Sequence, residues 1–264
     1  MNDKLQQILN KMQKYNTEHL AAIHFGLSEN ILYDALIVAP TYSPQKVLTG
    51  SDCRITKTGG QMYCAGYFVE KDNLKIAWIN VGTGSCNLID YLLLFGNYHF
   101  SKLIFIGAVG ALTDQFAVGD LCTPACSIAG TLANTYLKES LKAYVPFEKI
   151  YPAESYVEKI IGLAAANGCQ LKKASVFCTD SITMEYSHLE EIKSFGADLI
   201  EMETAAFYAI ADMMEVPSIA LLIVSDNSSL GIPIVGRNEE VQKIYHHTRQ
   251  VILPDLLFKI IHLQ

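Results

Sequence analysis

The chain alternates between short continuous apolar runs and longer stretches in which apolar residues recur at helical spacing. The continuous runs lie at 35–39, 103–106, 197–200 and 218–224. Runs of this kind are typical of strands that are covered on both faces of a sheet. Further strands are predicted over 62–69, 74–81, 119–128 and 173–178. Together these positions predict a sheet with a buried centre.

Helical spacing fills most of the stretches between the strands. Helices are predicted over 3–19, 85–95, 153–167, 187–194 and 237–263, and another one ends at Met214. Pro254 would interrupt the last helix. The segment 131–152 is rich in Tyr and Lys and predicts an insertion or a flap. Because strands and helices alternate nearly throughout, the order favours an N-terminal helix in 1–22 and a single α/β domain in 23–264.

Composition narrows the class of protein. Of the 264 residues, 50% are hydrophobic and 18% are charged, which indicates a globular chain with a sizeable core. A net charge of −7 argues against a nucleic-acid partner, which would need a basic face. No apolar run reaches the length of a membrane span, so no membrane partner is expected. The N-terminus lacks the apolar core of a signal peptide, and a cytoplasmic location is predicted.

The cysteines indicate free thiols. They number seven and are scattered along the chain, as Cys178 is in the small and apolar context ASVFCTD. Such residues are typical of buried thiols in a reducing compartment. The spacing between Cys122 and Cys126 is not a strong metal-binding spacing, and no histidine lies close by in the sequence. No metal site is therefore predicted.

The segment 199–227 carries the most informative chemistry. Glu201 and Glu203 stand where a buried strand meets a helix, and Ser225 and Asp226 stand at the carboxyl end of the next strand. In an open α/β sheet, ligands bind in the crevice outside the carboxyl ends of the strands. Burying an unpaired carboxylate is expensive, so acids in such an apolar context need a reason. The segment predicts a binding rim that contains positions 203 and 226.

Two glycine-rich strand ends fall into the same region. Gly82-Thr83-Gly84 lies between a strand and a helix, where backbone N–H groups could hold an anion or a sugar. Gly107-Ala108-Val109-Gly110 ends another strand. Each has a simpler interpretation, a tight turn for the first and close backbone packing for the second. Together with the acids, they favour a shared rim more than any one of them does alone.

Each acid also has two interpretations. Glu203 could accept hydrogen bonds from vicinal hydroxyls, whereas Glu201 could be a helix N-terminal acid stabilised by the helix dipole. Asp226 could be a general acid if burial raises its pKa, or a turn residue in an ordinary Asp-Asn-Ser-Ser loop. From the sequence alone, the two interpretations of Asp226 are about even.

With these residues assembled, the chain resembles the nucleoside phosphorylase and nucleosidase superfamily, which includes purine and uridine phosphorylases. The E-M-E and S-D motifs match, and their spacing, 226 − 203 = 23, is typical of the bacterial purine enzymes and methylthioadenosine nucleosidases. The run H-F-G-L-S-E-N from His24 looks like the start of the hexameric uridine phosphorylases. The resemblance covers most of the chain, from about residue 23 to the final helix. It implies a single-domain, three-layer α/β/α fold with a central mixed β-sheet, no cofactor, and a homo-oligomer, either a dimer or a trimer of dimers.

The resemblance also implies a role for each matching residue. Asp226 would protonate purine N7 and make the base a better leaving group, with assistance from Arg237. Glu203 would bind the ribose 2′ and 3′ hydroxyls, and His24 would reach the ribose 5′ position in the neighbouring subunit's site. The other contacts implied are Met202 and Thr83 at the ribose, Ile182, Thr183 and Ser225 at the base, and Gly82, Gly107 and Ala108 at the phosphate or water site.

The sequence departs from the family pattern at the phosphate site. Phosphorylases carry a G-D-P-x-R motif after the first strand, where this chain has P-T-Y-S-P-Q-K over 40–46. The family's arginine near the second glycine-rich strand end is Phe105 here, and the following Ser or Thr is Ala108. Because phosphate recognition depends on arginine forks, ordinary phosphorolysis is in doubt. The nucleosidases use a glutamate that activates water instead, and no acid near Ser43 matches it.

The predicted function is cleavage of the N-glycosidic bond of a nucleoside. The uracil-reading Gln and Arg of uridine phosphorylases are missing from 181–188, which together with Asp226 favours a purine nucleoside. Phosphorolysis and hydrolysis both stay open, although the lost arginines favour hydrolysis. The expected partners are a small nucleoside and, for phosphorolysis, phosphate. The alternative is a non-catalytic relative that binds or stores nucleosides.

Overall fold

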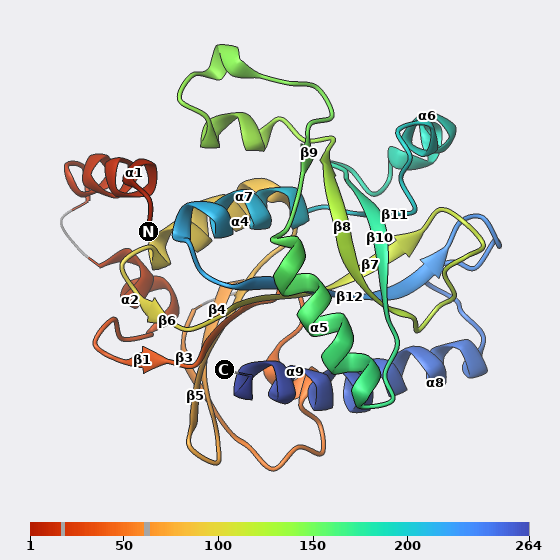
Figure 1. Ribbon diagram of the computed structural model, residues 1–264, viewed down its shortest axis with the longest axis horizontal. Helices are drawn as coiled ribbons and strands as arrows, with labels where there is room; N and C mark the ends of the chain where they lie inside the picture. The colour runs from red at the N-terminus through yellow and green to blue at the C-terminus, as the bar shows by residue number, and fades with distance from the viewer. Residues whose placement is uncertain (17–18, 61–63, 264) are drawn as a thin grey trace.

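A mixed β-sheet runs through the centre of the computed structural model, which describes residues 1–16, 19–60 and 64–263 (Figure 1). Its strand order is β11-β10-β8-β12-β7-β2-β5-β4-β3, and β9 pairs with β8. The strands of this sheet are β2 (Ala35–Val38), β3 (Arg54–Gly59), β4 (Cys64–Lys71), β5 (Leu74–Val81), β7 (Leu103–Ala111), β8 (Leu121–Ala129), β9 (Lys149–Ile150), β10 (Leu171–Cys178), β11 (Leu199–Glu201) and β12 (Ser218–Asn227). A separate pair is formed by β1 (Leu32–Tyr33) and β6 (His99–Phe100).

One half of the sheet closes on itself. β7 lies parallel to β2 and β12, whereas β4 is antiparallel to both β3 and β5. β11 pairs in parallel with β10 and also in antiparallel fashion with β7. The strands β7, β12, β8, β10 and β11 therefore form a ring, and the remaining strands extend from it. The prediction of a central mixed sheet is confirmed.

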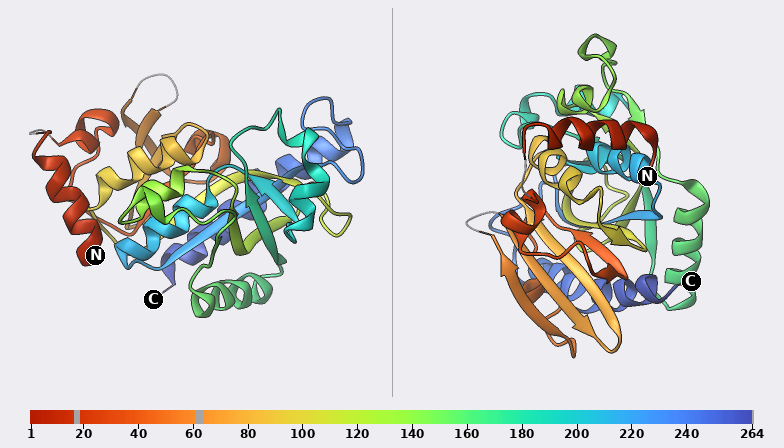
Figure 2. Two further views of the ribbon diagram at one scale, coloured as in Figure 1. Left: turned by 90° about the horizontal axis from the view of Figure 1, so that it is seen from above. Right: turned by 90° about the vertical axis from the view of Figure 1, so that its left-hand side faces the viewer.

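Helices cover both faces of the sheet and give three layers (Figures 1 and 2). One face carries α1 (Asp3–Gln13), α2 (Leu20–Phe25), α4 (Ser85–Leu92) and α7 (Thr204–Met214), and the other carries α5 (Glu154–Ala166), α8 (Glu239–His247) and α9 (Leu253–His262). Alternate side chains of β12 enter opposite apolar layers, with Ala220, Leu222 and Val224 on the α7 side and Ile219, Leu221 and Ile223 on the α9 side. This double burial explains why the run at 218–224 is continuously apolar.

Some element ends differ from the predicted ones. The helix predicted over 3–19 ends at Gln13, and the separate short helix α2 follows. The predicted interruption at Pro254 is a π-helical turn over Thr248–Ile252, directly before α9. Proline lacks the N–H that would bond to the preceding turn, so the wider turn absorbs the mismatch. The predicted strand start at 62 lies outside the described residues.

The strands that carry the glycine-rich and S-D motifs are longer than predicted. β7 continues from 106 to Ala111 and β12 from 224 to Asn227, because the two strands keep pairing through these residues. The sequence did not predict β3 or the short helix α3 (Pro44–Val47). The rim is therefore part of the sheet and not a pair of loops, which fixes its side chains more rigidly.

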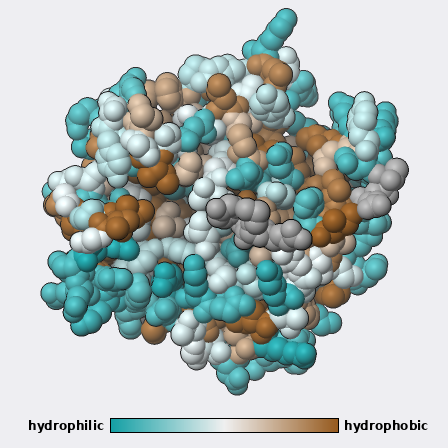
Figure 3. Space-filling model, turned by 180° about the vertical axis from the view of Figure 1, so that it is seen from behind, coloured by the Kyte–Doolittle hydropathy of each residue, from teal (hydrophilic) through white to brown (hydrophobic). Residues whose placement is uncertain are grey.

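The predicted flap projects from the body of the molecule beside β9, as the green segment at the top of Figure 1 shows. It contains two 3-10 turns, η2 (Ala133–Leu137) and η3 (Leu141–Ala143). On the face opposite to that of Figure 1, small patches of hydrophobic residues are scattered among hydrophilic ones (Figure 3). In the described part of the chain, no helix has the length and apolarity needed to cross a membrane.

Candidate active site

The ends of β7, β11 and β12 converge on Gly110. The register pairs Gly110 with Asp226 of β12 and with Ile200 of β11. A bulge in β12 between Val224 and Asp226 makes Ser225 an extra residue, and bulges beside active sites re-aim side chains. A Cβ at position 110 would lie 3.0 Å from Asp226 Oδ2 and 3.2 Å from Ile200 Cγ2. The absence of a side chain at Gly110 therefore lets the Asp226 carboxyl lie close against β7.

Glu201 is a structural acid that holds the start of α7. Its carboxylate accepts hydrogen bonds from the N–H of Glu203 at 2.7 Å, from the N–H and hydroxyl of Thr204 at 3.0 and 2.8 Å, and from the Cys178 thiol at 2.8 Å. The first N–H groups of a helix lack helical partners and favour negative charge. Burial raises the pKa of Glu201, and these hydrogen bonds oppose the shift. The geometry fits the interpretation of Glu201 as a helix N-terminal acid.

Glu203 joins the acid segment to the Gly82-Thr83-Gly84 loop. Its Oε1 accepts the Gly84 N–H at 2.5 Å, and the Ser85 hydroxyl donates to the Met202 carbonyl at 2.7 Å. Burial and, to a lesser degree, the charge of Glu201 raise the pKa of Glu203 well above its usual range. A carboxyl group in either protonation state keeps acceptor sites beyond the one that Gly84 uses, so Glu203 can still hydrogen-bond the hydroxyls of a ligand.

Asp226 lies in a setting suited to a proton donor. Burial raises the pKa of its carboxyl, while the Ser225 hydroxyl and the charge of Arg237 oppose the rise. The Ser225 hydroxyl donates to Asp226 Oδ1 at 2.5 Å. Arg237 donates to the Ser225 carbonyl and stacks on the Tyr245 ring, with 4.5 Å between the guanidinium carbon and the ring centroid. Arg237 therefore affects Asp226 in two ways. It holds the backbone of the neighbouring residue Ser225, and its charge lowers the pKa of the Asp226 carboxyl.

These groups line one cavity of about 250 Å³. The cavity brings together eight of the residues predicted for the site: Thr83, Gly107, Ala108, Ile182, Met202, Glu203, Ser225 and Asp226. Pockets that bind small molecules are concave, with a few polar groups that converge on the ligand. Thr83 follows β5, Ile182 lies in the turn after β10, Glu203 precedes α7 and Asp226 lies on β12, so the sheet topology assembles the site.

Four residues predicted for the site do not line this cavity. The Gly82 N–H bonds to the Pro40 carbonyl at 3.2 Å, so Gly82 shapes a turn. Thr183 is exposed, and Arg237 lies behind Ser225. His24 is exposed on α2, and its ring packs edge-on against Tyr91 with 5.7 Å between centroids. The roles of these residues toward a ligand stay predictions.

Glu185 lines the cavity and was not predicted. It is the first residue of the 3-10 turn η4 (Glu185–Ser187), it is 9% exposed, and no hydrogen bond or ion pair of its carboxyl occurs among the described residues. Burial, together with the charge of Asp226, raises the pKa of Glu185 to about 7. The sequence signal was an isolated acid between Met184 and Tyr186, close to the predicted base contacts.

The part of the cavity beside the loop after β2 is lined by uncharged residues. It is formed by Pro40, Thr41, Gly107 and Ala108, and no described Arg or Lys lines the cavity. Phe105, at the position of the family's arginine, is 1% exposed and packs against Phe207 with 5.4 Å between ring centroids. The residue at the position that the sequence resemblance assigns to the arginine is therefore part of the apolar core.

The loop after β2 is held by neighbouring side chains. Trp78 Nε1 and the Asn80 amide both donate to the Tyr42 carbonyl at 2.9 Å, and the Asn80 amide also donates to the Ala39 carbonyl at 2.6 Å. The loop after β2 is thus shaped by neutral hydrogen bonds to its backbone, which place Thr41 at the cavity.

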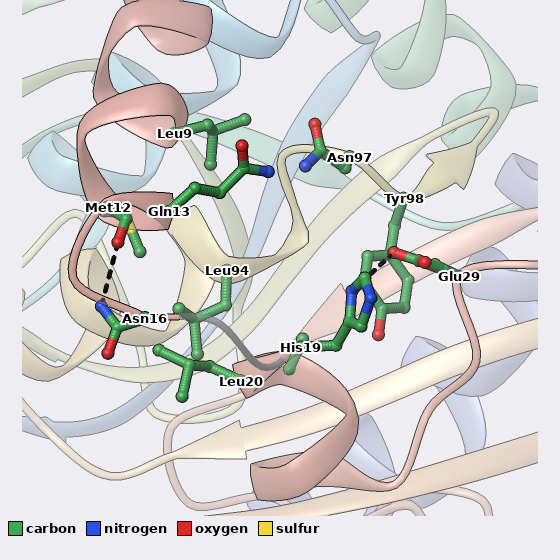
Figure 4. Close-up of a pocket in the computed structure, with 11 residues that line it drawn as sticks. Leu9, Met12, Gln13, Asn16, His19, Leu20, Glu29, Leu94, Asn97 and Tyr98 are labelled. Carbon is green, nitrogen blue, oxygen red and sulfur yellow. Dashed lines mark hydrogen bonds and ion pairs between the residues drawn. The ribbon is translucent and has the colours of Figure 1, made fainter.

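A second hollow, of about 70 Å³, lies between α1, α2 and the turn before β6 (Figure 4). Its side chains are mostly apolar or amide groups, and His19 and Glu29 form an ion pair at 3.3 Å across it. Its small volume and its distance in the fold from Asp226 and Glu203 make it a packing gap beside the N-terminal helices.

Comparison with known proteins agrees with this geometry. Residues 48–249 match the profile of the Phosphorylase superfamily. The chain belongs to this superfamily. A relative in the superfamily, the DeoD-type purine nucleoside phosphorylase of Geobacillus stearothermophilus, is 24% identical over 238 residues, which are 88% of this chain and 97% of the relative. The resemblance seen in the sequence is thereby confirmed, and the chain is an enzyme of the nucleoside phosphorylase and nucleosidase type.

Solved structures of the superfamily share the fold. The 5′-methylthioadenosine/S-adenosylhomocysteine nucleosidase of Campylobacter jejuni aligns with a TM-score of 0.66 and 19% identity, over 86% of this chain and 97% of its own. The uridine phosphorylase of Vibrio fischeri aligns with a TM-score of 0.70 and 16% identity, over 90% and 95%. Because a nucleosidase and a phosphorylase both match, fold alone does not decide the reaction, and the residues of the cavity must do so.

Proposed function

We propose that the protein cleaves the N-glycosidic bond of purine nucleosides by hydrolysis. The observation that carries the proposal is that one cavity holds both Asp226, a partly buried carboxyl with a raised pKa, and Glu203, while no described Arg or Lys lines it. A raised pKa favours the protonated form of a carboxyl, which is the form that a general acid needs. Phosphate, in contrast, is bound most strongly by cationic side chains, and no described Arg or Lys lines this cavity.

The reaction follows from the two acids. Protonated Asp226 donates its proton to purine N7 while the electron pair of the C1′–N9 bond moves into the base. The sugar passes through an oxocarbenium-like state, and Glu203 holds its 2′ and 3′ hydroxyls in place. Water then attacks C1′ and releases a proton to solvent, which leaves ribose and the free base. Arg237 and Ser225 keep the Asp226 carboxyl oriented toward the base.

The base end of the cavity supports a purine. N7 and the substituent at C6 lie on the same edge of a purine ring. Asp226 and Glu185 line the same cavity, and we expect a purine with N7 at Asp226 to turn its C6 group toward Glu185. We expect release of base from inosine and adenosine and at least about tenfold slower release from uridine, measured by chromatography. Equal rates for uridine would contradict the purine assignment.

The pKa of Glu185, about 7, predicts a pH-dependent choice of base. Below this pH, the protonated acid can donate to the 6-oxo group of inosine; above it, the carboxylate can accept from the 6-amino group of adenosine. The ratio of kcat/KM for adenosine to that for inosine should therefore rise as pH increases through about 7. Because titration of Asp226 affects both substrates, the ratio isolates Glu185. In Glu185→Gln, the ratio should be independent of pH. If the ratio rises with pH in that variant as it does in the unmodified protein, Glu185 does not select the base.

We further propose that His24 serves the site of a neighbouring subunit. His24 is exposed on α2 and Ile23 beside it is 56% exposed, so both are free to meet a second copy. The protein should therefore be at least a dimer in solution by light scattering. A monomer that is fully active would eliminate this role.

A further inference from the structure

Another cavity, of about 270 Å³, adjoins the candidate active site at Glu185, where we expect the base to bind. Thr179 and Glu185 line both cavities, so they form the shared wall. On the far side of that wall lie Phe147, Phe177 and Phe195. Asp180, His188 and Glu191 also line this cavity, so it extends the site beyond Glu185 with both aromatic and charged residues in its lining.

The three phenylalanines form an ordered aromatic surface. The rings of Phe147 and Phe195 stack with 4.1 Å between centroids and 26° between planes, and Phe177 and Phe195 lie 6.0 Å apart at 16°. Nearly parallel rings of this kind present a face or an edge to an apolar group. Phe177 comes from β10 and Phe195 follows α6 (Leu189–Ser194), whereas Phe147 comes from the flap. The flap thus completes the cavity.

The backbone at Phe147 supports a specific role for its ring. Phe147 has a φ of +53°, a left-handed conformation that is rare for a bulky residue, and its side chain is still 38% exposed. Such a conformation persists where packing holds it. Here the stack on Phe195 holds the ring over the cavity, although part of its surface is left for another apolar group.

The orientation of a bound purine connects the two cavities. With N7 at Asp226, the substituent at C6 points toward Glu185, which is the shared wall. An N6-substituted adenine keeps one N–H that can donate to the Glu185 carboxylate, and its substituent continues past Glu185. We infer that the preferred substrate is a purine nucleoside with a bulky apolar or aromatic group on N6, and that the phenylalanine-lined cavity receives this group.

This inference rests on the proposed function, since it uses the same base site. Its test compares N6-benzyladenosine with adenosine, by calorimetric binding and by base release. Burial of the benzyl group should make N6-benzyladenosine bind about tenfold tighter than adenosine. In Phe147→Ala this preference should fall about tenfold, toward equal binding. Tyr144→Ala, an exposed aromatic of the same flap that does not line the cavity, should keep the preference of the unmodified protein.

The outcomes separate the inference from the proposed function. Tighter binding of adenosine than of N6-benzyladenosine, or a preference that Phe147→Ala leaves intact, overturns the inference and leaves the function standing. Preferred binding of N6-benzyladenosine without any base release supports the cavity assignment and overturns the catalytic function. If neither nucleoside binds, both are wrong.

Discussion

Replacing Asp226 with asparagine should lower kcat for release of base from inosine by about 10²- to 10⁴-fold, the range for loss of a general acid. Asparagine keeps the size of the side chain and can still accept from Ser225, but its amide has no acidic proton to transfer to N7. Nucleoside binding should change much less than kcat. Single-turnover kinetics and calorimetry on the same preparation would measure both quantities.

The same experiment also tests the storage alternative that the sequence left open. A protein that only stores nucleosides would bind them, would release no base, and would be indifferent to Asp226→Asn. The matched control is Asp212→Asn, which removes an exposed carboxyl on α7 and should leave kcat unchanged. Unimpaired turnover in Asp226→Asn would remove the acid from the mechanism.

Replacing Glu203 with glutamine should lower kcat/KM for inosine by about 10²- to 10³-fold, because the hydrogen bonds to two sugar hydroxyls are weakened or lost. Glu203 is fixed by the Gly84 N–H, so it presents its acceptors to the sugar without rearrangement. A glutamine keeps the shape of the side chain and replaces one acceptor oxygen with an NH2 donor.

The comparison with 2′,3′-dideoxyinosine shows whether the loss arises at the sugar. The unmodified protein should strongly prefer inosine, and Glu203→Gln should lose most of that preference because the partner of the hydroxyls is gone. Glu240→Gln, an exposed acid in the first turn of α8, serves as the control. If Glu203→Gln discriminates against the dideoxy sugar as strongly as before, Glu203 does not hold the hydroxyls.

Much of the fold could be predicted because periodicity and burial act locally. The run at 218–224 is apolar on both faces, and β12 is covered on both faces. The end of the same strand could not be predicted, because Ser225 and Asp226 look like a loop until β7 is beside them to pair with. The predicted end of the helix over 3–19 was wrong for a similar reason. Only packing against the rest of the chain decides where a short amphipathic helix ends.

In the candidate site, too, some residues could be predicted from local sequence and others depend on tertiary contacts. Asp226 and Glu203 were found because a fixed spacing in one βαβ unit brings them to one rim. Glu185 was missed because its burial depends on how η4 folds over the cavity, which no local pattern records. Phe105 could be recognised as a missing arginine, but only its contact with Phe207 shows that the side chain has joined the core.

The central claim is that water, and not phosphate, attacks the sugar. Inosine should be incubated in phosphate-free buffer and in buffer with added phosphate, and the sugar product identified by mass spectrometry. The uncharged part of the cavity beside the loop after β2 predicts hypoxanthine and free ribose in both buffers, at the same rate. Base release that requires phosphate, with ribose 1-phosphate as the product, would contradict the claim.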